Sequence, residues 1–184
     1  METSAAIKAP DFTLRNVRTN ESISLSSYKG KVVLLDFWAT WCKPCETTIP
    51  ILQQVESSFS SREFQLISID VQWGNGENDI VVRSFIAAKG MDWLVVKDTA
   101  DNATAIAYGI GEIPTFFVID QSGNIRKSYQ GAIITVQELE NQIAALIKEG
   151  GLVSGEVLLG GFLLGIIGVV AIIKMVSRKK KVSE

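Results

Sequence analysis

The fold and the chemistry of this chain are both indicated by one stretch, KVVLLDFWATWCKPC (residues 31–45). Its first half, from Lys31 to Trp38, is apolar and rich in β-branched residues, which is typical of a buried strand. After Cys45, apolar residues recur at helical spacing, at Ile51, Leu52, Val55 and Phe59. We therefore expect Cys42 and Cys45 to lie where a strand ends and a helix begins.

A cysteine in the first turn of a helix is well placed to be reactive. Free backbone N–H groups and the positive end of the helix dipole lie there, and both favour the nucleophilic thiolate over the thiol. Lys43 adds a nearby positive charge, and Pro44 is compatible with a first helical turn. We predict that Cys42 attacks a substrate and that Cys45, one turn further on, resolves the mixed disulfide.

Two other roles for the cysteine pair fit the sequence less well. A zinc site needs about four ligands, and the chain has two cysteines and no histidine, so only a site shared between chains would remain. A purely structural disulfide between residues so close in sequence would restrain little of the unfolded chain. The strand–CxxC–helix context favours redox chemistry over both.

The segment from Leu35 to Cys45 resembles the active-site segment of thioredoxins, and EIPTFFVID (residues 112–120) resembles their cis-proline strand. The run from Ala9 to about Ile147 is similar to the TlpA-like, membrane-associated branch of that superfamily. The resemblance implies a thioredoxin-like α/β fold, with a central mixed sheet flanked by helices and an N-terminal β-hairpin. It also implies a cis Ile113–Pro114 bond packed against Cys42, where Ile113 would pair with an extended substrate.

Asp36 is the one charged residue between Val32 and Trp38. Burial should raise its pKa. Thioredoxins have an aspartate six residues before the first cysteine, and Asp36 has that spacing, so we expect it to accept a proton beneath the CxxC rather than simply to reach water at a strand end. Trp38 is expected in the core. Trp41 abuts the nucleophile and is expected on a partly exposed docking surface.

Periodicity and turn residues predict the other elements. A hairpin is expected between Phe12 and Leu25, and a capping box at Thr135–Glu138 starts a late helix. The other predicted strands cover residues 64–71, 93–96, 116–119 and 125–130, and the other predicted helices cover residues 79–89 and 101–108, with Asp101 as N-cap.

The C-terminal part of the chain has the composition of a membrane anchor. Residues 157–173 are 17 consecutive uncharged and mostly apolar residues, long enough to cross about 26 Å of a hydrocarbon core of about 30 Å. Five of the 18 basic residues fall in the last eleven positions, which predicts a cytoplasmic tail and an extracytoplasmic redox domain, although no secretory signal is visible at the N-terminus. A dimer through the GxxxG pattern of Gly161 and Gly165 is a weaker hypothesis.

We therefore predict a flexible start (residues 1–9), a redox domain (10–149), a linker (150–156), a transmembrane helix (157–176) and a basic tail (177–184). Residues 1–173 carry 13 basic and 19 acidic residues, which argues against a nucleic-acid partner.

The predicted activity is thiol–disulfide exchange with protein substrates, without cofactor or metal, and re-reduction by an integral membrane electron donor is implied by the resemblance. TlpA-like reductants that serve cytochrome c assembly often have a glutamate three residues after the second cysteine, where this chain has Thr48. The site therefore resembles a general thioredoxin more closely. The alternatives are a membrane-anchored holdase or scaffold without redox turnover and, ranked lower, a thiol peroxidase.

Overall fold

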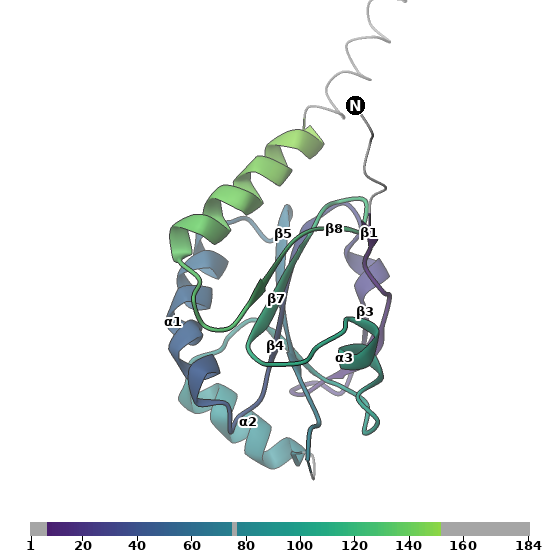
Figure 1. Ribbon diagram of the computed structural model, residues 1–184, viewed down its shortest axis with the longest axis vertical. Coiled ribbons are helices and arrows are strands. Elements are labelled where there is room, and N and C mark those ends of the chain that lie inside the picture. The colour runs from purple at the N-terminus through teal and green to yellow at the C-terminus, as the bar shows by residue number, and fades with distance from the viewer. Residues whose placement is uncertain (1–6, 75–76, 152–184) are drawn as a thin grey trace, which may run out of the picture. The chain divides into compact units, whose positions relative to one another are not determined.

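The computed structural model of the chain describes residues 7–74 and 77–151 (Figure 1). The first compact unit of the chain ends at Ile147, and its core is an eight-stranded sheet of order β1-β8-β7-β4-β5-β6-β2-β3. The strands are β1 (Ile7–Lys8), β2 (Thr13–Asn16), β3 (Ser22–Ser24), β4 (Val32–Trp38), β5 (Phe64–Asp70), β6 (Leu94–Lys97), β7 (Thr115–Ile119) and β8 (Asn124–Gln130). The helices are η1 (Leu25–Tyr28, a 3₁₀ turn), α1 (Lys43–Ser58), α2 (Asp79–Ala88), α3 (Ala103–Ala107) and residues 136–151.

The sheet is mixed, as expected. β4 pairs in parallel with β5 and antiparallel with β7, and every residue of β4 is buried. Strands covered on both faces need apolar side chains on both faces, which explains the near-continuous apolar sequence of β4. The predicted hairpin is present as β2 and β3, and it extends the sheet by pairing β2 with β6.

Helices cover the two faces of the sheet. Figure 1 shows α1, α2 and the helix that begins at residue 136 on one face and α3 on the other. Successive side chains of β4 point to opposite faces and contact opposite layers. Phe37 packs against Tyr108, the residue that ends α3, with 5.3 Å between ring centroids. Trp38 packs against Phe85 of α2, with 5.4 Å between ring centroids. Asp36 is even-numbered like Trp38, so it shares the face that α1 and α2 cover.

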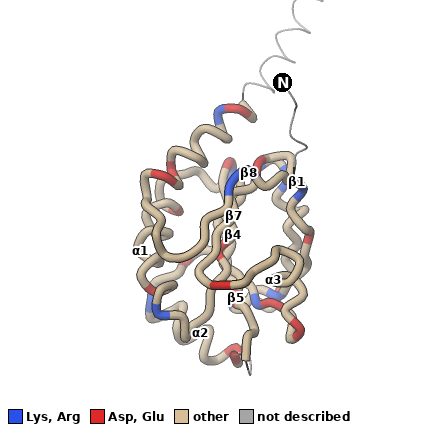
Figure 2. The backbone as a smooth tube through the Cα atoms, viewed as in Figure 1, with Lys and Arg blue, Asp and Glu red and all other residues tan. Residues whose placement is uncertain are grey.

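Charged side chains are rare in the central strands. Asp36 and Asp70 are the two charged residues in β4, β5 and β7, and the other described charged residues lie outside these three strands (Figure 2). Trp38 is 1 % exposed, which confirms its expected place in the core.

The structure corrects two local predictions. β6 begins at Leu94, so Trp93 precedes the strand. The N-cap of α3 is Asn102 and not Asp101. Asn102 adopts a left-handed conformation (φ 55°), and its side-chain oxygen accepts a hydrogen bond from the Gln72 N–H, 2.7 Å away, so it does not cap the helix N–H groups. The N–H of Ala103, the first residue of α3, donates to the Thr99 hydroxyl oxygen at 3.0 Å. The next two N–H groups donate to the Asp98 carboxylate, at 3.1 Å from Thr104 and 2.8 Å from Ala105.

The late helix forms with its capping box, since the Thr135 hydroxyl donates to Glu138 at 2.8 Å and the Glu138 N–H donates to Thr135 at 3.2 Å. It is still helical at Gly150 and Gly151, the first two residues of the predicted linker. Within residues 7–74 and 77–151, no helix is long and apolar enough to cross a membrane. The predicted transmembrane helix, the glycine pattern and the basic tail lie outside the described residues.

Candidate active site

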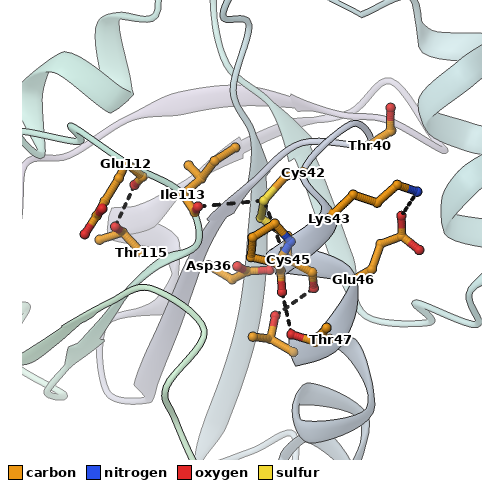
Figure 3. Close-up of a disulfide and its surroundings, with 12 residues drawn as sticks. Asp36, Thr40, Cys42, Lys43, Cys45, Glu46, Thr47, Glu112, Ile113 and Thr115 are labelled. Atoms are coloured by element: carbon orange, nitrogen blue, oxygen red, sulfur yellow. Dashed lines mark hydrogen bonds and ion pairs between the residues drawn. A yellow bond between two sulfur atoms is a disulfide. The ribbon is translucent and has the colours of Figure 1, made fainter.

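The two cysteines lie at the start of α1, where the sequence predicts them. Cys42 is the N-cap residue, and its sulfur accepts a hydrogen bond from the Cys45 N–H at 3.2 Å. Pro44 occupies the first turn, where its missing N–H costs nothing. The two sulfur atoms are joined in a disulfide (S–S 2.01 Å), so the pair is close enough to exchange electrons between dithiol and disulfide forms (Figure 3).

The site is more enclosed than the sequence suggested. Cys42 is 4 % exposed and Cys45 is 3 % exposed. Lys43 contributes less positive charge to Cys42 than expected, because its ammonium group pairs with Glu46 at 2.8 Å, and Lys89 pairs with the same carboxylate at 2.8 Å. These two lysines lower the pKa of Glu46 to about 2. The helix N-terminus, with its N–H bond to the Cys42 sulfur, is therefore the main local feature that favours a thiolate.

The proline loop packs against the attacking sulfur. The Ile113–Pro114 bond is cis, as the resemblance implied, and the Ile113 carbonyl oxygen lies 3.8 Å from the Cys42 sulfur. A disulfide sulfur has no proton to donate, so in this state the contact is one of packing. Trp41 is 51 % exposed, Ile113 is half-buried and Pro114 is buried. Trp41 and Ile113 thus leave apolar surface open next to the disulfide.

Asp36 lies under the site, and Figure 3 shows its side chain extending from β4 toward the end of α1 that carries Cys45. It is 2 % exposed, and burial raises its pKa to about 7, opposed by a hydrogen bond from the Ser68 hydroxyl to Oδ2 at 2.7 Å. Its other oxygen, Oδ1, has no hydrogen-bond partner among the described residues. A carboxyl group with such a pKa can take up or release a proton near neutral pH.

Thr48 stands at the position where the cytochrome-type relatives often carry glutamate. It is 1 % exposed, and its hydroxyl donates to the Cys45 carbonyl oxygen at 2.8 Å. Thr48 therefore completes the helix backbone and brings no charge to the disulfide.

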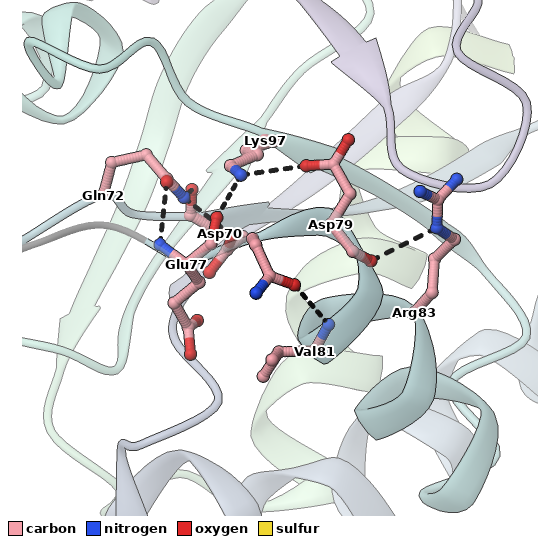
Figure 4. Close-up of polar contacts among 8 residues, drawn as sticks. Asp70, Gln72, Glu77, Asp79, Val81, Arg83 and Lys97 are labelled. Atoms are coloured by element: carbon pink, nitrogen blue, oxygen red, sulfur yellow. Dashed lines mark hydrogen bonds and ion pairs between the residues drawn. The ribbon is translucent and has the colours of Figure 1, made fainter.

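A second polar cluster, which the sequence analysis did not single out, lies at the end of β5 (Figure 4). Asp70 is fully buried, and its Oδ2 accepts a hydrogen bond from Gln72 at 2.8 Å. Burial and the nearby Glu77 carboxylate raise the pKa of Asp70 to about 9. The Glu77 side chain also accepts hydrogen bonds from the Thr40 backbone N–H, at 3.0 Å, and from the Thr40 hydroxyl. This cluster therefore anchors the loop two residues before Cys42.

An aspartate in the apolar run of β5 was the available signal for this cluster, the same kind of signal that drew attention to Asp36. Glu77 lies in a polar loop and carries no such signal. Among the residues that the structure describes, no group of three or more His, Cys, Asp and Glu side chains is arranged to hold a metal ion.

Comparisons with known proteins agree with this geometry. The model of the Redoxin family matches residues 4–143. The thiol-disulfide oxidoreductase ResA of Geobacillus kaustophilus (strain HTA426) is 32 % identical over 138 residues, which are 75 % of each chain. ResA of Bacillus subtilis (strain 168) is 33 % identical over 142 residues, 77 % of this chain and 75 % of its own.

Solved structures give the same result. A putative thiol:disulfide interchange protein DsbE from Chlorobium tepidum superposes with a TM-score of 0.69 and 29 % identity, covering 79 % of this chain and 99 % of the other. StoA from Bacillus subtilis superposes with a TM-score of 0.61 and 28 % identity, covering 72 % and 96 %.

Proposed function

The chain belongs to the Redoxin family and is a thiol-disulfide oxidoreductase, and from this premise we propose that it exchanges disulfides with protein substrates at a membrane surface. The observation that carries the proposal is the Cys42–Cys45 disulfide at the N-terminus of α1, with the Ile113 carbonyl oxygen 3.8 Å from the Cys42 sulfur. An exchange reaction needs one sulfur that a substrate can approach and a second sulfur within bonding distance of the first.

In the reductive direction, the Cys42 thiolate attacks one sulfur of a substrate disulfide. A bond forms between Cys42 and that sulfur, the substrate disulfide breaks, and the second substrate sulfur leaves as a thiolate. Cys45 then loses its proton to Asp36 and attacks Cys42, which forms the Cys42–Cys45 disulfide and releases the first substrate sulfur. Two electrons pass from the cysteine pair to the substrate, and the reverse sequence oxidises a substrate dithiol.

Trp41, Ile113 and Pro114 are the proposed substrate-binding residues. An extended substrate segment would pair with the backbone of Ile113, and the half-exposed Trp41 ring would pack against its side chains. Both contacts place a substrate disulfide next to Cys42, the attacking sulfur.

Two matched variants test the assignment of the cysteines, with insulin as the disulfide substrate. Cys45→Ser keeps the attacking sulfur, so it should accumulate a mixed disulfide with the substrate, whereas Cys42→Ser should accumulate none and lose reductase activity. The measurement is non-reducing mass analysis of the trapped adduct. Unchanged insulin reduction by Cys42→Ser would overturn the assignment in favour of a holdase or scaffold.

The membrane tether rests on the composition of residues 157–176, and the basic residues after them favour a cytoplasmic tail. An integral membrane electron donor would then reach the redox domain from the same bilayer. Ser183→Cys in a Cys42→Ser/Cys45→Ser background tests the orientation, because an impermeant maleimide should not label Cys at this position in intact cells. Labelling before lysis would reverse the proposed orientation.

A further inference from the structure

A one-way hydrogen-bond chain reaches Asp36 from outside the cysteine motif. The Trp93 indole N–H lies 2.8 Å from the Ser68 hydroxyl oxygen, and that oxygen lies 2.7 Å from Asp36 Oδ2. An indole N–H can only donate, so Ser68 accepts from Trp93. The single proton of the Ser68 hydroxyl is then directed to Asp36.

The chain is fixed by the sheet. Ser68 of β5 lies directly opposite Asp36 of β4 in the strand register, and Trp93 immediately precedes β6, which pairs with β5. All three side chains are buried, with exposures of 2 % for Asp36, 0 % for Ser68 and 5 % for Trp93. A buried serine hydroxyl can usually rotate to choose its acceptor, but here the Trp93 donor removes that choice.

The two carboxyl oxygens of Asp36 are consequently unequal. Oδ2 accepts the Ser68 proton, and Oδ1 has no hydrogen-bond partner among the described residues. Of the two oxygens that could accept a proton, Oδ2 already accepts a hydrogen bond and Oδ1 does not.

We propose that Ser68 and Trp93 are positioning residues for thiol–disulfide exchange, which hold Asp36 Oδ2 and so assign Oδ1 as the atom that accepts the Cys45 proton. The proposal rests on the proposed function and deepens it. In the resolving step the S–H bond of Cys45 breaks, an O–H bond forms at Oδ1, and the Cys45 electron pair forms the new bond to Cys42. In the oxidative direction Oδ1 returns the same proton.

Other titratable groups do not account for the behaviour of Asp36. The elements packed against it carry Asp70 on β5 and Lys97 on β6, and β7 carries none. The covering helices α1 and α2 carry, besides the two cysteines at the start of α1, Lys43, Glu46 and Glu56 on α1 and Asp79 and Arg83 on α2. The factors that move the pKa of Asp36 are burial, which raises it, and the Ser68 hydrogen bond, which lowers it. Ser68 therefore counteracts burial and keeps Asp36 able to ionise near neutral pH.

The test uses the full chain with Ser68→Ala, which removes the hydroxyl with little change in volume. The rate of insulin reduction should reach half its maximum about one pH unit higher than in the parent chain, and should be about fivefold lower at pH 7. Ser68→Thr, which keeps a hydroxyl, should restore the parent profile. Trp93→Phe should give a smaller upward shift, because the hydroxyl remains but is no longer oriented.

A direct titration separates this proposal from the proposed function. The carbon-13 signal of the Asp36 carboxyl group, followed by NMR against pH, should move to a higher midpoint in Ser68→Ala whether or not insulin is reduced. An unchanged midpoint in Ser68→Ala would overturn the positioning role even if the chain is an active reductase. A shifted midpoint in an inactive chain would support the hydrogen-bond chain and count against the proposed function instead.

Discussion

Asp36 and Asp70 are two buried carboxyl groups on neighbouring strands and on the same face of the sheet. Trp38 pairs with Asp70 in the strand register just as Asp36 pairs with Ser68. Each carboxyl group has one oxygen that accepts a hydrogen bond and one without a partner among the described residues. Yet the pKa of Asp36 is raised to about 7 and that of Asp70 to about 9.

The difference comes from the neighbours and not from burial alone. Burial is the largest cause of both shifts, but Asp70 also lies near the Glu77 carboxylate, and a second negative charge nearby disfavours ionisation further. At neutral pH Asp70 therefore stays protonated and serves the fold, while Asp36 is close to its midpoint and can exchange protons. The comparison shows that a buried aspartate is suited to proton transfer only where its surroundings stop the pKa from rising too far.

The largest effect that tests this comparison is on stability. Both acids have a folded pKa above the unfolded value of 3.8, so their contribution to stability is fully present below pH 3.8. It is lost as the pH rises to about 7 for Asp36 and to about 9 for Asp70, at up to about 1.4 kcal/mol per pH unit and group. Asp36→Asn should remove the part of this loss that is due to Asp36, which falls below pH 7. Asp70→Asn should remove the part that is due to Asp70, which includes about 2 kcal/mol of unfolding free energy lost between pH 7 and 9.

Urea unfolding of the disulfide form at pH 5, 7 and 9 measures these free energies. The two variants should differ from each other mainly above pH 7. Identical pH profiles for Asp36→Asn and Asp70→Asn would mean that the two carboxyl groups titrate alike, and the comparison would fail.

A second, smaller effect is on catalysis. Asp36→Asn removes the proton acceptor of the resolving step, so the rate of insulin reduction at pH 7 should fall about tenfold or more. Asp70→Asn should change the rate by less than about twofold, because Asp70 is already uncharged at that pH. The measurement is the steady-state rate of insulin reduction by each full-length variant at pH 7. A comparable loss of rate in the two variants would mean that Asp70 also takes part in proton transfer.

The smallest effect should follow from Glu77→Gln, which removes the charge beside Asp70 and leaves an amide oxygen to accept from Thr40. The pKa of Asp70 should fall, and that of Asp36 should not change, because Glu77 does not act on it. Carboxyl carbon NMR titration measures both groups at once. Glu63→Gln, at an exposed position before β5, is the matched control, and an equal shift in that variant would show a general charge effect.

The sequence predicted the parts of the molecule that depend on local patterns. Three such predictions are present in the structure, and each depends only on residues close together in the sequence. They are the apolar run of β4, the cysteines at the start of α1 and the capping box of the late helix. The resemblance to thioredoxins supplied the cis bond at Ile113–Pro114. The exact start of β6 and the N-cap of α3 were wrong, because each is set by a partner distant in sequence, such as Gln72 for Asn102.

By itself, then, the sequence determined that Cys42 and Cys45 would sit at the head of a helix after a buried strand, because period and turn chemistry are local properties of a chain. Only the tertiary structure decided what surrounds Asp36 and Asp70. Ser68 is 32 residues from Asp36, and Glu77 is 37 residues from the Thr40 that it holds. The order of the strands brings these residues together, and the neighbours that it supplies set the charge of each carboxyl group.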